Sequence, residues 1–499
     1  MAKVIMVQGT TSNAGKSLIT AALCKIFKQD GFKTAPFKSQ NMALNSYITK
    51  DGLEMGRAQV MQAEAAEIEP DVRMNPILLK PTGESGCQIV LNGKVFKDMT
   101  AGEYYTYKDD MIPHIMAAYE SLSKEYDIIV IEGAGSPAEI NLRDKDIVNM
   151  GMAKLVDAPV IIVGDIDRGG VFASLAGTML LFNEKERQRV KGFVINKFRG
   201  NVDLLMPGLD ELSNITKVKT LGVVPYLNVD IDDEDSVSER LNYDGKQGLI
   251  DIAVIRLPRL SNFTDFNVFS MVKGVSVRYV SSARELGEPD MIIIPGTKNT
   301  IEDLKWMRQQ GLDLRIKKHV SDGNVIFGIC GGYQMLGEEI SDPDNVEGGG
   351  IIQGLGLLKI KTTFYKEKTT TQTEGKINQL KGLFKRLSGI KITGYEIHMG
   401  NSEIIDGIPM NVIDGKFDGC VNDNVAGTYL HGIFDNSEVV NNIVKILADN
   451  KGVEMNELNN FDINEYKESQ YEILADCVRK SLDMDKIYEI IGIEKPIIR

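Results

Sequence analysis

The segment 325–337 restricts the possible folds more than any other, because a strand, a sharp turn and a helix follow one another within it. Val325-Ile326-Phe327 is an apolar run typical of a buried strand, and the turn after it reads Gly-x-Cys-x-Gly with Cys330 at its centre. This order predicts a nucleophile elbow at the end of a parallel strand, with Cys in place of Ser. Gly328 and Gly331 are expected to allow the sharp turn. The alternative is an ordinary buried cysteine in front of a glycine turn.

Composition narrows the classes of protein to which the chain can belong. Its 499 residues suggest about three domains, and a hydrophobic fraction of 43% suffices for proper cores. The net charge of −13 argues against a nucleic-acid partner. The five cysteines are scattered without a Cys-x-x-Cys pair, which favours a reducing, cytoplasmic location over disulfides or metal knuckles. A strand follows Met1 almost at once and no apolar run approaches membrane-spanning length, so we expect neither a signal peptide nor a membrane partner.

A second strand–loop–helix pattern begins at the N-terminus and predicts a phosphate-binding loop. The apolar run Val4–Val7 leads into a loop that ends in Gly15-Lys16-Ser17, and an amphipathic helix follows. Backbone N–H groups would wrap the phosphates of ATP, Lys16 would reach the outer ones, and Ser17 would hold Mg²⁺. The usual spacing is Gly-x4-Gly-Lys, whereas five residues separate the two glycines here. This longer spacing resembles that of dethiobiotin synthetase, and the ATP-binding residues predicted in the loop are Gly9, Thr10, Asn13, Ala14, Gly15, Lys16 and Ser17.

Apolar runs alternate with helical stretches to about residue 226, which predicts a parallel, doubly wound sheet with ligands at the strand C-termini. The run Tyr126–Ile131 ends in Glu132, which is expected beside the phosphate loop, where it would reach Mg²⁺ directly or through water. An ordinary strand-end acid is the alternative, but Glu132-Gly133-Ala134-Gly135 also resembles dethiobiotin synthetase. Another run ends in Asn196, and in related nucleotide-binding folds an Asn at this place reads the adenine.

Polar residues after the first helix are candidates for binding an acceptor substrate. A segment rich in amide and hydroxyl groups includes Gln40 and Asn41, and a segment of helical spacing after it includes Arg57. Their place in the chain puts them near the γ-phosphate end of the predicted nucleotide site. Arg168, in a glycine-rich loop after a later strand, is a further cationic candidate. The alternative is a solvated loop, a surface helix and ordinary surface charges.

An acidic, turn-rich stretch divides the chain. Residues 1–227 would form the nucleotide-binding domain, residues 228–249 a linker, and residues 250–438 a second α/β domain around Cys330. From residue 439 to residue 499 the chain is acidic and helical in pattern, without a catalytic signature. We therefore expect two doubly wound α/β domains and a helical C-terminal extension.

A nucleophilic cysteine requires a base within hydrogen-bond reach, and the chain has only four histidines. His114 precedes a helical run in the nucleotide domain and is expected to be structural. His319 lies on a lysine-rich helical face and is expected to be solvated. His398 and His431 both end β-like segments of the second domain. We favour His431 as the base for Cys330, because it follows a strand that ends in a glycine turn, where active-site loops are common.

The elbow and the later strand–histidine pattern resemble class I glutamine amidotransferases, in which a cysteine attacks the side-chain amide of glutamine. The resemblance implies that Cys330 is the nucleophile and His431 the base. The backbone N–H groups of Gly296 and Gly331 are oxyanion-hole candidates, at a neighbouring strand end and beside the nucleophile. Such enzymes usually carry His-x-Glu, but this chain has Ile433 where the orienting Glu is expected. That departure is known in the cobyric acid and cobyrinate amidase branch, and it leaves the third member of the arrangement open.

Over about residues 2–440 the chain resembles the cobyric acid synthase family. The resemblance implies an ATP- and Mg²⁺-dependent enzyme that takes nitrogen from glutamine and amidates a corrinoid, adenosylcobyrinic acid a,c-diamide, at its b, d, e and g propionates. The alternative is a cobyrinate a,c-diamide synthase, which lacks the Ser-Gln-Asn-Met segment, or another ATP-dependent carboxylate amidase. Self-association into a homo-oligomer is left open. The motifs that carry the resemblance are Gln8-Gly9-Thr10, Lys38-Ser39-Gln40-Asn41-Met42, Gly56-Arg57-Ala58-Gln59, Gly164–Gly170, Asn196–Gly200 and Gly394–His398.

Two rival classes of protein share parts of this pattern. One is a P-loop partitioning ATPase fused to an inactive domain, but the signature lysine that such ATPases carry early in the loop is replaced here by Thr10–Asn13. The other is a cysteine hydrolase or peptidase that uses nucleotide only for regulation. An assay for glutamine hydrolysis separates both from an amidotransferase.

Overall fold

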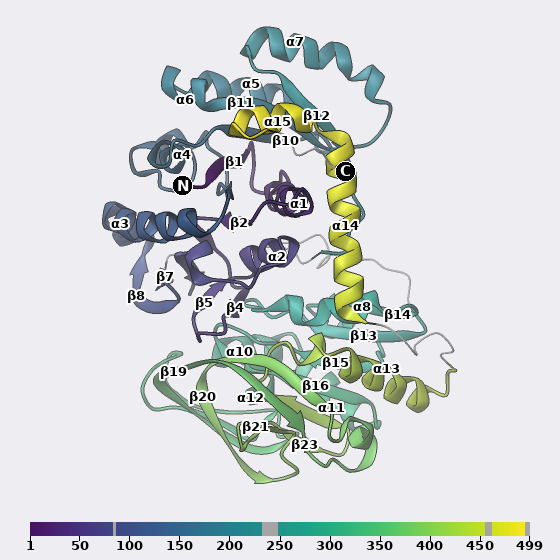
Figure 1. Ribbon diagram of the computed structural model, residues 1–499. Helices are drawn as coiled ribbons and strands as arrows, with labels where there is room; N and C mark the ends of the chain where they lie inside the picture. The colour runs from purple at the N-terminus through teal and green to yellow at the C-terminus, as the bar shows by residue number, and fades with distance from the viewer. Residues whose placement is uncertain (83–85, 232–247, 455–461, 495–499) are drawn as a thin grey trace. The chain divides into compact units, whose positions relative to one another are not determined.

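The computed structural model describes residues 1–82, 86–231, 248–454 and 462–494, which form two compact units (Figure 1). The first unit comprises residues 1–42, 55–231 and 467–499, and the second comprises residues 43–54 and 232–466. Most of the expected linker, residues 232–247, lies outside the described residues. In the described part of the chain, no helix combines the length and apolarity needed to cross a lipid bilayer.

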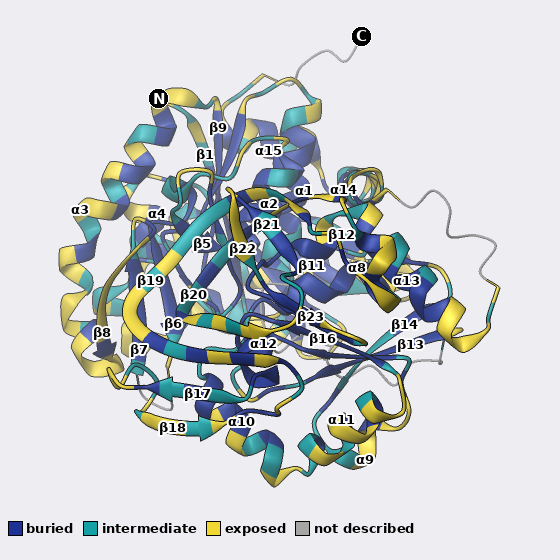
Figure 2. Cartoon of the chain, turned by 90° about the horizontal axis from the view of Figure 1, so that it is seen from below, coloured by how far each residue is buried: buried dark blue, intermediate teal, exposed yellow. Residues whose placement is uncertain are grey.

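A six-stranded parallel sheet lies at the centre of the first unit, which confirms the α/β fold predicted from its apolar runs. The innermost strands, including β1 and β9, are almost entirely dark blue in Figure 2, because helices pack on the sheet and parallel strands are buried on both faces. In spatial order the strands are β12 (Thr220–Pro225), β11 (Val190–Phe198), β10 (Val160–Asp165), β1 (Lys3–Gly9), β9 (Ile128–Glu132) and β2 (Thr34–Phe37).

Helices and a smaller sheet complete the N-terminal part of this unit. Capping boxes, Thr100 with Glu103 and Asn183 with Glu186, begin two of the helices. The helices are α1 (Lys16–Gln29), α2 (Arg57–Ala65), α3 (Ala101–Glu125), α4 (Met150–Leu155), α5 (Val171–Leu181), α6 (Glu184–Arg189) and α7 (Met206–Thr216). A four-stranded sheet, which the sequence did not predict, consists of β3 (Gln40–Met42), β6 (Ile77–Pro81), β7 (Gly86–Leu91) and β8 (Lys94–Thr100).

The C-terminal helices α14 (Ile463–Ser481) and α15 (Met484–Ile491) contribute to the core of the first unit. Leu474 and Tyr488 share a hydrophobic cluster with Phe27 of α1, and the rings of Tyr488 and Phe27 meet edge to face at 5.6 Å. The ammonium of Lys25, also on α1, is buried and forms ion pairs with Glu67, Glu468 and Glu472. The helix behind the phosphate loop is therefore supported by the last part of the chain.

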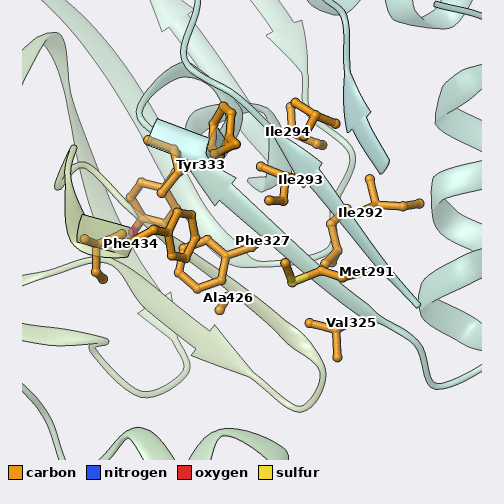
Figure 3. Close-up of a cluster of buried hydrophobic side chains, with 14 of the residues drawn as sticks. Met291, Ile292, Ile293, Ile294, Val325, Phe327, Tyr333, Ala426 and Phe434 are labelled. Carbon is orange, nitrogen blue, oxygen red and sulfur yellow. The ribbon is translucent and has the colours of Figure 1, made fainter. Parts of the chain in front are cut away.

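The second unit is built around another six-stranded sheet, parallel except for one edge strand. In spatial order its strands are β14 (Val275–Val280), β13 (Ile250–Ile255), β15 (Met291–Ile294), β16 (Val325–Ile329), β24 (Val425–Thr428) and β23 (Cys420–Asn422). Its helices are α8 (Asn267–Met271), α9 (Ala283–Leu286), α10 (Thr300–Gln309), α11 (Leu312–Ser321), α12 (Gly331–Leu336) and α13 (Ser437–Lys451). Figure 3 shows part of the core, in which Phe434 packs edge to face on Phe327 at 5.0 Å.

A further sheet of the second unit was not predicted. Its long strands β19 (Lys359–Ile377) and β20 (Lys391–Asp406) pair antiparallel, and the shorter β4 (Ser46–Ile48) contacts both of them. The remaining strands of this sheet are β17 (Glu339–Asp342), β18 (Gly350–Gln353), β21 (Asn411–Ile413) and β22 (Lys416–Asp418).

Candidate functional site

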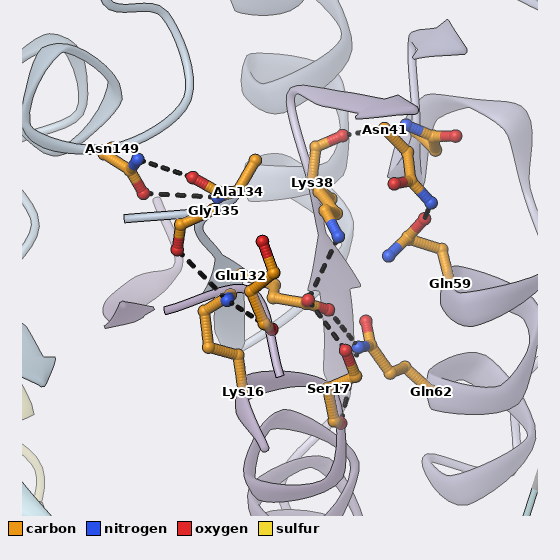
Figure 4. Close-up of polar contacts among 12 residues, drawn as sticks. Lys16, Ser17, Lys38, Asn41, Gln59, Gln62, Glu132, Ala134, Gly135 and Asn149 are labelled. Carbon is orange, nitrogen blue, oxygen red and sulfur yellow. Dashed lines mark hydrogen bonds and ion pairs between the residues drawn. The ribbon is translucent and has the colours of Figure 1, made fainter. Parts of the chain in front are cut away.

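The predicted phosphate loop connects β1 to α1. Gly15 caps the helix with a φ of +95°, and a Cβ at this position would collide with Nδ2 of Asn196, so only glycine fits. Lys16 is 3% exposed. Its Nζ donates to three backbone carbonyls, those of Thr11 at 2.9 Å, Ser12 at 3.0 Å and Gly135 at 3.1 Å (Figure 4). A cation is thereby held at the N-terminus of α1, where the unpaired N–H groups of the first turn favour an anion.

Glu132, at the end of β9, is the centre of a buried polar cluster and is 1% exposed (Figure 4). Ser17 Oγ and Lys38 Nζ donate to its Oε1 at 2.9 and 3.0 Å, and Gln62 Nε2 donates to its Oε2 at 2.5 Å. Ser17 and Glu132 are thus adjacent, as the sequence predicted. Lys38 and Gln62 were missed as site residues, although each lies in or beside a motif that had been singled out.

The residues at this cluster fit a magnesium ion. A hydroxyl and a carboxylate are hard oxygen ligands, and Mg²⁺ in nucleotide sites takes its other ligands from phosphates and water. Among the described residues, no group of three or more His, Cys, Asp or Glu side chains could hold a metal alone. Ser17 and Glu132 would therefore supply two ligands of a site that nucleotide and water complete.

Asn196 ties β11 to the phosphate loop, because its Nδ2 donates to the carbonyl of Ala14 at 2.9 Å. The next residue, Lys197, donates to the carbonyl of Asn13 at 2.8 Å and to Asp165 Oδ2 at 2.9 Å. These contacts fix the loop from the side opposite Glu132 in the sheet order. Recognition of adenine by Asn196 stays a prediction.

Of the acceptor candidates, Gln40 and Asn41 lie together on β3. Gln40 Oε1 accepts a hydrogen bond from the hydroxyl of Tyr104 at 2.6 Å, and Asn41 Nδ2 donates to Gln59 Oε1 at 3.2 Å. Arg57 is buried at the start of α2, with its guanidinium 3.7 Å from Glu64. Arg168 is exposed on the loop between β10 and α5. Asn41 and Arg57 are buried, which removes the surface-residue alternative for these two, whereas Gln40 is half-buried.

The predicted elbow is present, and its unusual backbone is at Cys330 itself. Cys330 has φ +51° and ψ −110° between β16 and α12, a conformation that non-glycine residues rarely adopt. The two glycines that were expected to allow the turn, Gly328 and Gly331, do so without a positive φ. They are small for packing: a Cβ at Gly328 would lie 2.6 Å from Leu336, and one at Gly331 would lie 2.8 Å from Thr297.

His431 is the histidine beside the cysteine. It is 1% exposed, and its Nδ1 lies 2.7 Å from Oδ2 of Asp265. A Cβ at Gly296 would contact both His431 and Cys330, so the two side chains flank the same glycine, while the thiol of Cys330 contacts the carbonyl of Ile397 at 3.6 Å. Burial alone lowers the pKa of His431, but the charge of Asp265, the hydrogen bond to Asp265 and the nearby Cys330 thiol raise the pKa to about 10. The imidazolium is thus favoured next to the sulfur, an arrangement that activates a cysteine.

Asp265 fills the place that the absent Glu left open. It lies on the 3₁₀ turn η5 (Phe263–Phe266), which follows β13, and sequence reasoning missed it. The available signal was the polar run Ser261-Asn262 and Thr264-Asp265 after a buried strand, since strand C-termini carry the active-site loops of such sheets.

The other histidines of this unit make different contacts. His398 stacks on Tyr429 with ring centroids 3.8 Å apart, and its Nδ1 is 2.7 Å from the carbonyl of Gly400. The expectation that His319 is solvated was wrong: the side chain is buried, with Nε2 3.0 Å from the carbonyl of Val325. Helix α11, which carries His319, contacts β16, and this contact buries the ring despite its lysine-rich neighbours.

The two oxyanion candidates lie next to the cysteine. A Cβ at Gly296 would be 3.2 Å from Cε1 of His431 and 3.6 Å from Cβ of Cys330. Gly331 opens α12, so its N–H belongs to the first-turn groups that have no intrahelical acceptor. Both positions suit donors to an oxyanion formed at Cys330, and that role stays a prediction.

A Cys–His–Asp arrangement on one α/β unit and a phosphate loop on another define a glutamine amidotransferase with a nucleotide-binding domain. The family models agree: residues 251–439 match the CobB/CobQ-like glutamine amidotransferase domain, and residues 5–236 match the CobQ/CobB/MinD/ParA nucleotide binding domain.

Relatives along the whole chain specify the family. The chain is 60% identical to a cobyric acid synthase of Ruminiclostridium cellulolyticum, over 99% of this chain and 98% of the relative. It is 57% identical to one of Lachnoclostridium phytofermentans (98% and 99% covered) and 53% identical to one of Thermoanaerobacter sp. (98% and 99% covered). The chain belongs to the cobyric acid synthase family.

Proposed function

We propose that this enzyme uses ATP and glutamine to amidate the b, d, e and g propionates of adenosylcobyrinic acid a,c-diamide, giving adenosylcobyric acid of cobalamin biosynthesis, in the cytoplasm. The observation that carries the proposal is the presence in one chain of two complementary sites. One holds Cys330 against His431 and Asp265, and the other holds Lys16 and Glu132 at a phosphate loop. A nitrogen source and a means of activating carboxylates are both required for amidation.

At the first site, Cys330 attacks the side-chain amide carbon of glutamine. The N–H groups of Gly296 and Gly331 stabilise the oxyanion, and His431 gives its proton to the departing ammonia. The product is a γ-glutamyl thioester on Cys330. His431 then removes a proton from water, which attacks the thioester and releases glutamate. Asp265 holds the imidazole in one tautomer and orientation through the 2.7 Å hydrogen bond to Nδ1.

At the second site, the carboxylate of the acceptor is made reactive. A carboxylate resists ammonia at neutral pH because hydroxide is a poor leaving group, and ATP supplies the phosphoryl group that converts it to an acyl phosphate. Lys16 offsets the charge that develops on the transferred group, while Ser17 and Glu132 would hold Mg²⁺. Ammonia attacks the acyl carbon, and phosphate departs.

The acceptor is proposed to lie against Gln40, Asn41, Arg57 and Arg168, which combine amides with cations. The buried atoms Gln59 Nε2 and Gln62 Oε1 have no hydrogen-bond partner among the described residues. Unpaired buried amides next to this segment suit a polar ligand. A cobyrinate a,c-diamide synthase remains the alternative, and supplying each of the two corrinoids separately decides between them.

The test separates the two sites. Cys330→Ser should lose amidation with glutamine and keep it with ammonium, whereas Lys16→Ala should lose both and keep glutamine hydrolysis. Products are followed by mass spectrometry of the corrinoid and by glutamate release. Retained glutamine-dependent amidation in Cys330→Ser, or retained amidation in Lys16→Ala, contradicts the proposal.

A further inference from the structure

The segment Ala43–Glu54 comes from the N-terminal part of the chain but belongs to the second unit. It directly follows the acceptor candidates Gln40 and Asn41, and its strand β4 contacts β20. It lies outside residues 251–439, the range that matches the amidotransferase family model. Its contacts nevertheless reach the groups that surround His431.

Asn45 and Ser46 hold the turn that carries Asp265. Asn45 Oδ1 accepts from the N–H of Phe263 at 3.1 Å. Ser46 N–H donates to Asn262 Oδ1 at 3.3 Å, and Ser46 O accepts from Asn262 Nδ2 at 3.2 Å. Asn262 has a φ of +50°, and its carbonyl accepts the N–H of Asp265 at 3.1 Å. Asn262, which begins this turn with a left-handed backbone, is therefore held by Ser46 through both the oxygen and the nitrogen of its side-chain amide.

Ser46 also holds the aromatic ring that packs on His431. The hydroxyl of Tyr395 donates to Ser46 O at 3.1 Å and accepts from Asn262 Nδ2 at 2.9 Å. The Tyr395 ring stacks on the imidazole of His431, with centroids 5.4 Å apart and planes 14° from parallel. The two backbones exchange hydrogen bonds of 3.0 and 2.9 Å. The carbonyl of Ser46 thus accepts hydrogen bonds from Tyr395, whose ring stacks on His431, and from Asn262, which begins the turn that carries Asp265.

We propose that Asn45 and Ser46 are positioning residues for glutamine hydrolysis, holding Asp265 and Tyr395 against His431. The proposal rests on the proposed function. Asn45, Ser46, Asn262 and Tyr395 are all buried, and a buried, connected hydrogen-bond network is stiff. Misplacement of a reacting group by about 1 Å reduces a rate on the order of 100-fold, so loosening this network should be visible in kcat.

Two variants remove the contacts without touching the reacting groups. Asn45→Ala removes the acceptor of the Phe263 N–H, and Tyr395→Phe removes only the hydroxyl and keeps the ring on His431. Each should lower kcat for glutamine hydrolysis by about 10- to 100-fold, with KM for glutamine changed by less than about threefold. Ammonium-driven amidation should match that of the unaltered enzyme. Tyr47→Phe is the matched control, because the hydroxyl of Tyr47 accepts from Gln372 instead, and kcat should be unchanged.

A double-mutant cycle shows whether Asn45 acts through Asp265. Asn45→Ala should lower kcat much less in an Asp265→Asn background than in the unaltered one, since residues that act as a unit are not additive. Equal effects in both backgrounds, or hydrolysis within about twofold of normal in both Asn45→Ala and Tyr395→Phe, would overturn the proposal. If Asn45→Ala does not fold, the isosteric Tyr395→Phe decides alone. No hydrolysis by the unaltered enzyme refutes the proposed function as well, whereas normal hydrolysis in the variants refutes only this inference.

Discussion

The loops after β1 and β16 are both strand–turn–helix connections at the C-terminal end of a parallel strand, yet they place the unusual backbone differently. In the phosphate loop the positive φ belongs to Gly15, and Asn196 occupies the space that a Cβ would need. In the elbow the positive φ belongs to Cys330, while Gly332 packs so closely under the carbonyl of Ile294 that a Cβ there would collide with it.

This difference follows from what each loop presents. A loop that binds an anion through backbone N–H groups gains from having no side chain at its tightest point. An elbow must keep a side chain there, because the reacting sulfur is attached to Cβ, so the strain of about 1–3 kcal/mol has to be balanced by packing around it. Glycine therefore sits at the strained residue in one loop and beside it in the other.

The largest expected effect concerns the site around Cys330. Asp265→Asn should lower kcat for glutamine hydrolysis by about 10²- to 10⁴-fold, because the amide no longer stabilises the imidazolium or selects its tautomer. Glutamate release measures the loss. Amidation driven by ammonium should stay within about twofold of normal, which separates this loss from unfolding. Near-normal hydrolysis would show that Asp265 is not the orienting group.

The phosphate loop is tested by comparing Gly15, at its end, with Gly31, which lies after α1. The two glycines have nearly equal φ, +95° and +91°. Gly15→Ala should weaken ATP binding on the order of 100-fold, because strain and the collision with Asn196 act together. Gly31→Ala meets nothing within 4 Å and carries the strain alone, about 1–2 kcal/mol of stability, with normal ATP binding. Calorimetric titration with ATP compares the two. Similar affinities would mean that the loop can move away from Asn196.

The sequence predicted both loops because each has a local pattern: an apolar strand, fixed glycine positions and a helix. It predicted Lys16, Ser17 and Glu132 in one cluster, and Cys330 near His431, for the same reason. The polar run at Asp265 is a local signal, but its pairing with His431 and the Ser46 contacts were not predictable, since partners about 170 and 350 residues distant in sequence have no shared spacing. The positive φ of Cys330 was not predicted, because a glycine in a turn can serve either packing or a positive φ, and only coordinates distinguish these.

Buried leucines in the cores that support the two loops should have an intermediate effect, which is on the stability of each unit. Leu474 on α14 packs in the core that includes α1, whereas Leu447 on α13 packs in the core of the second unit, and both are fully buried. Leu474→Ala and Leu447→Ala should each destabilise by about 2–5 kcal/mol, but in different units. Hydrogen exchange of α1 and of β16 would distinguish them. Loss of protection in β16 for Leu474→Ala would contradict the assignment of the C-terminal helices to the first unit.

The last expected effect is on the pH dependence of stability, and it should arise at His431 in the Cys330 site. The pKa of His431 is raised to about 10 in the folded enzyme by Asp265 and Cys330 against the opposing effect of burial, compared with about 6.5 when unfolded. The folded state therefore keeps a proton that the unfolded state releases. Its stabilising contribution is complete below about pH 6.5 and is lost as the pH rises through about 10.

Asp265→Asn removes the charge that raises this pKa and leaves the burial that lowers it. The difference in unfolding free energy between the unaltered enzyme and Asp265→Asn should therefore narrow steadily as the pH rises from about 6.5 to about 10. Urea denaturation at several pH values measures it. Gly31→Ala provides the control, because its difference from the unaltered enzyme should not vary with pH. A constant difference for Asp265→Asn would mean that His431 is neutral in the folded enzyme, and the sulfur would then lack its imidazolium partner.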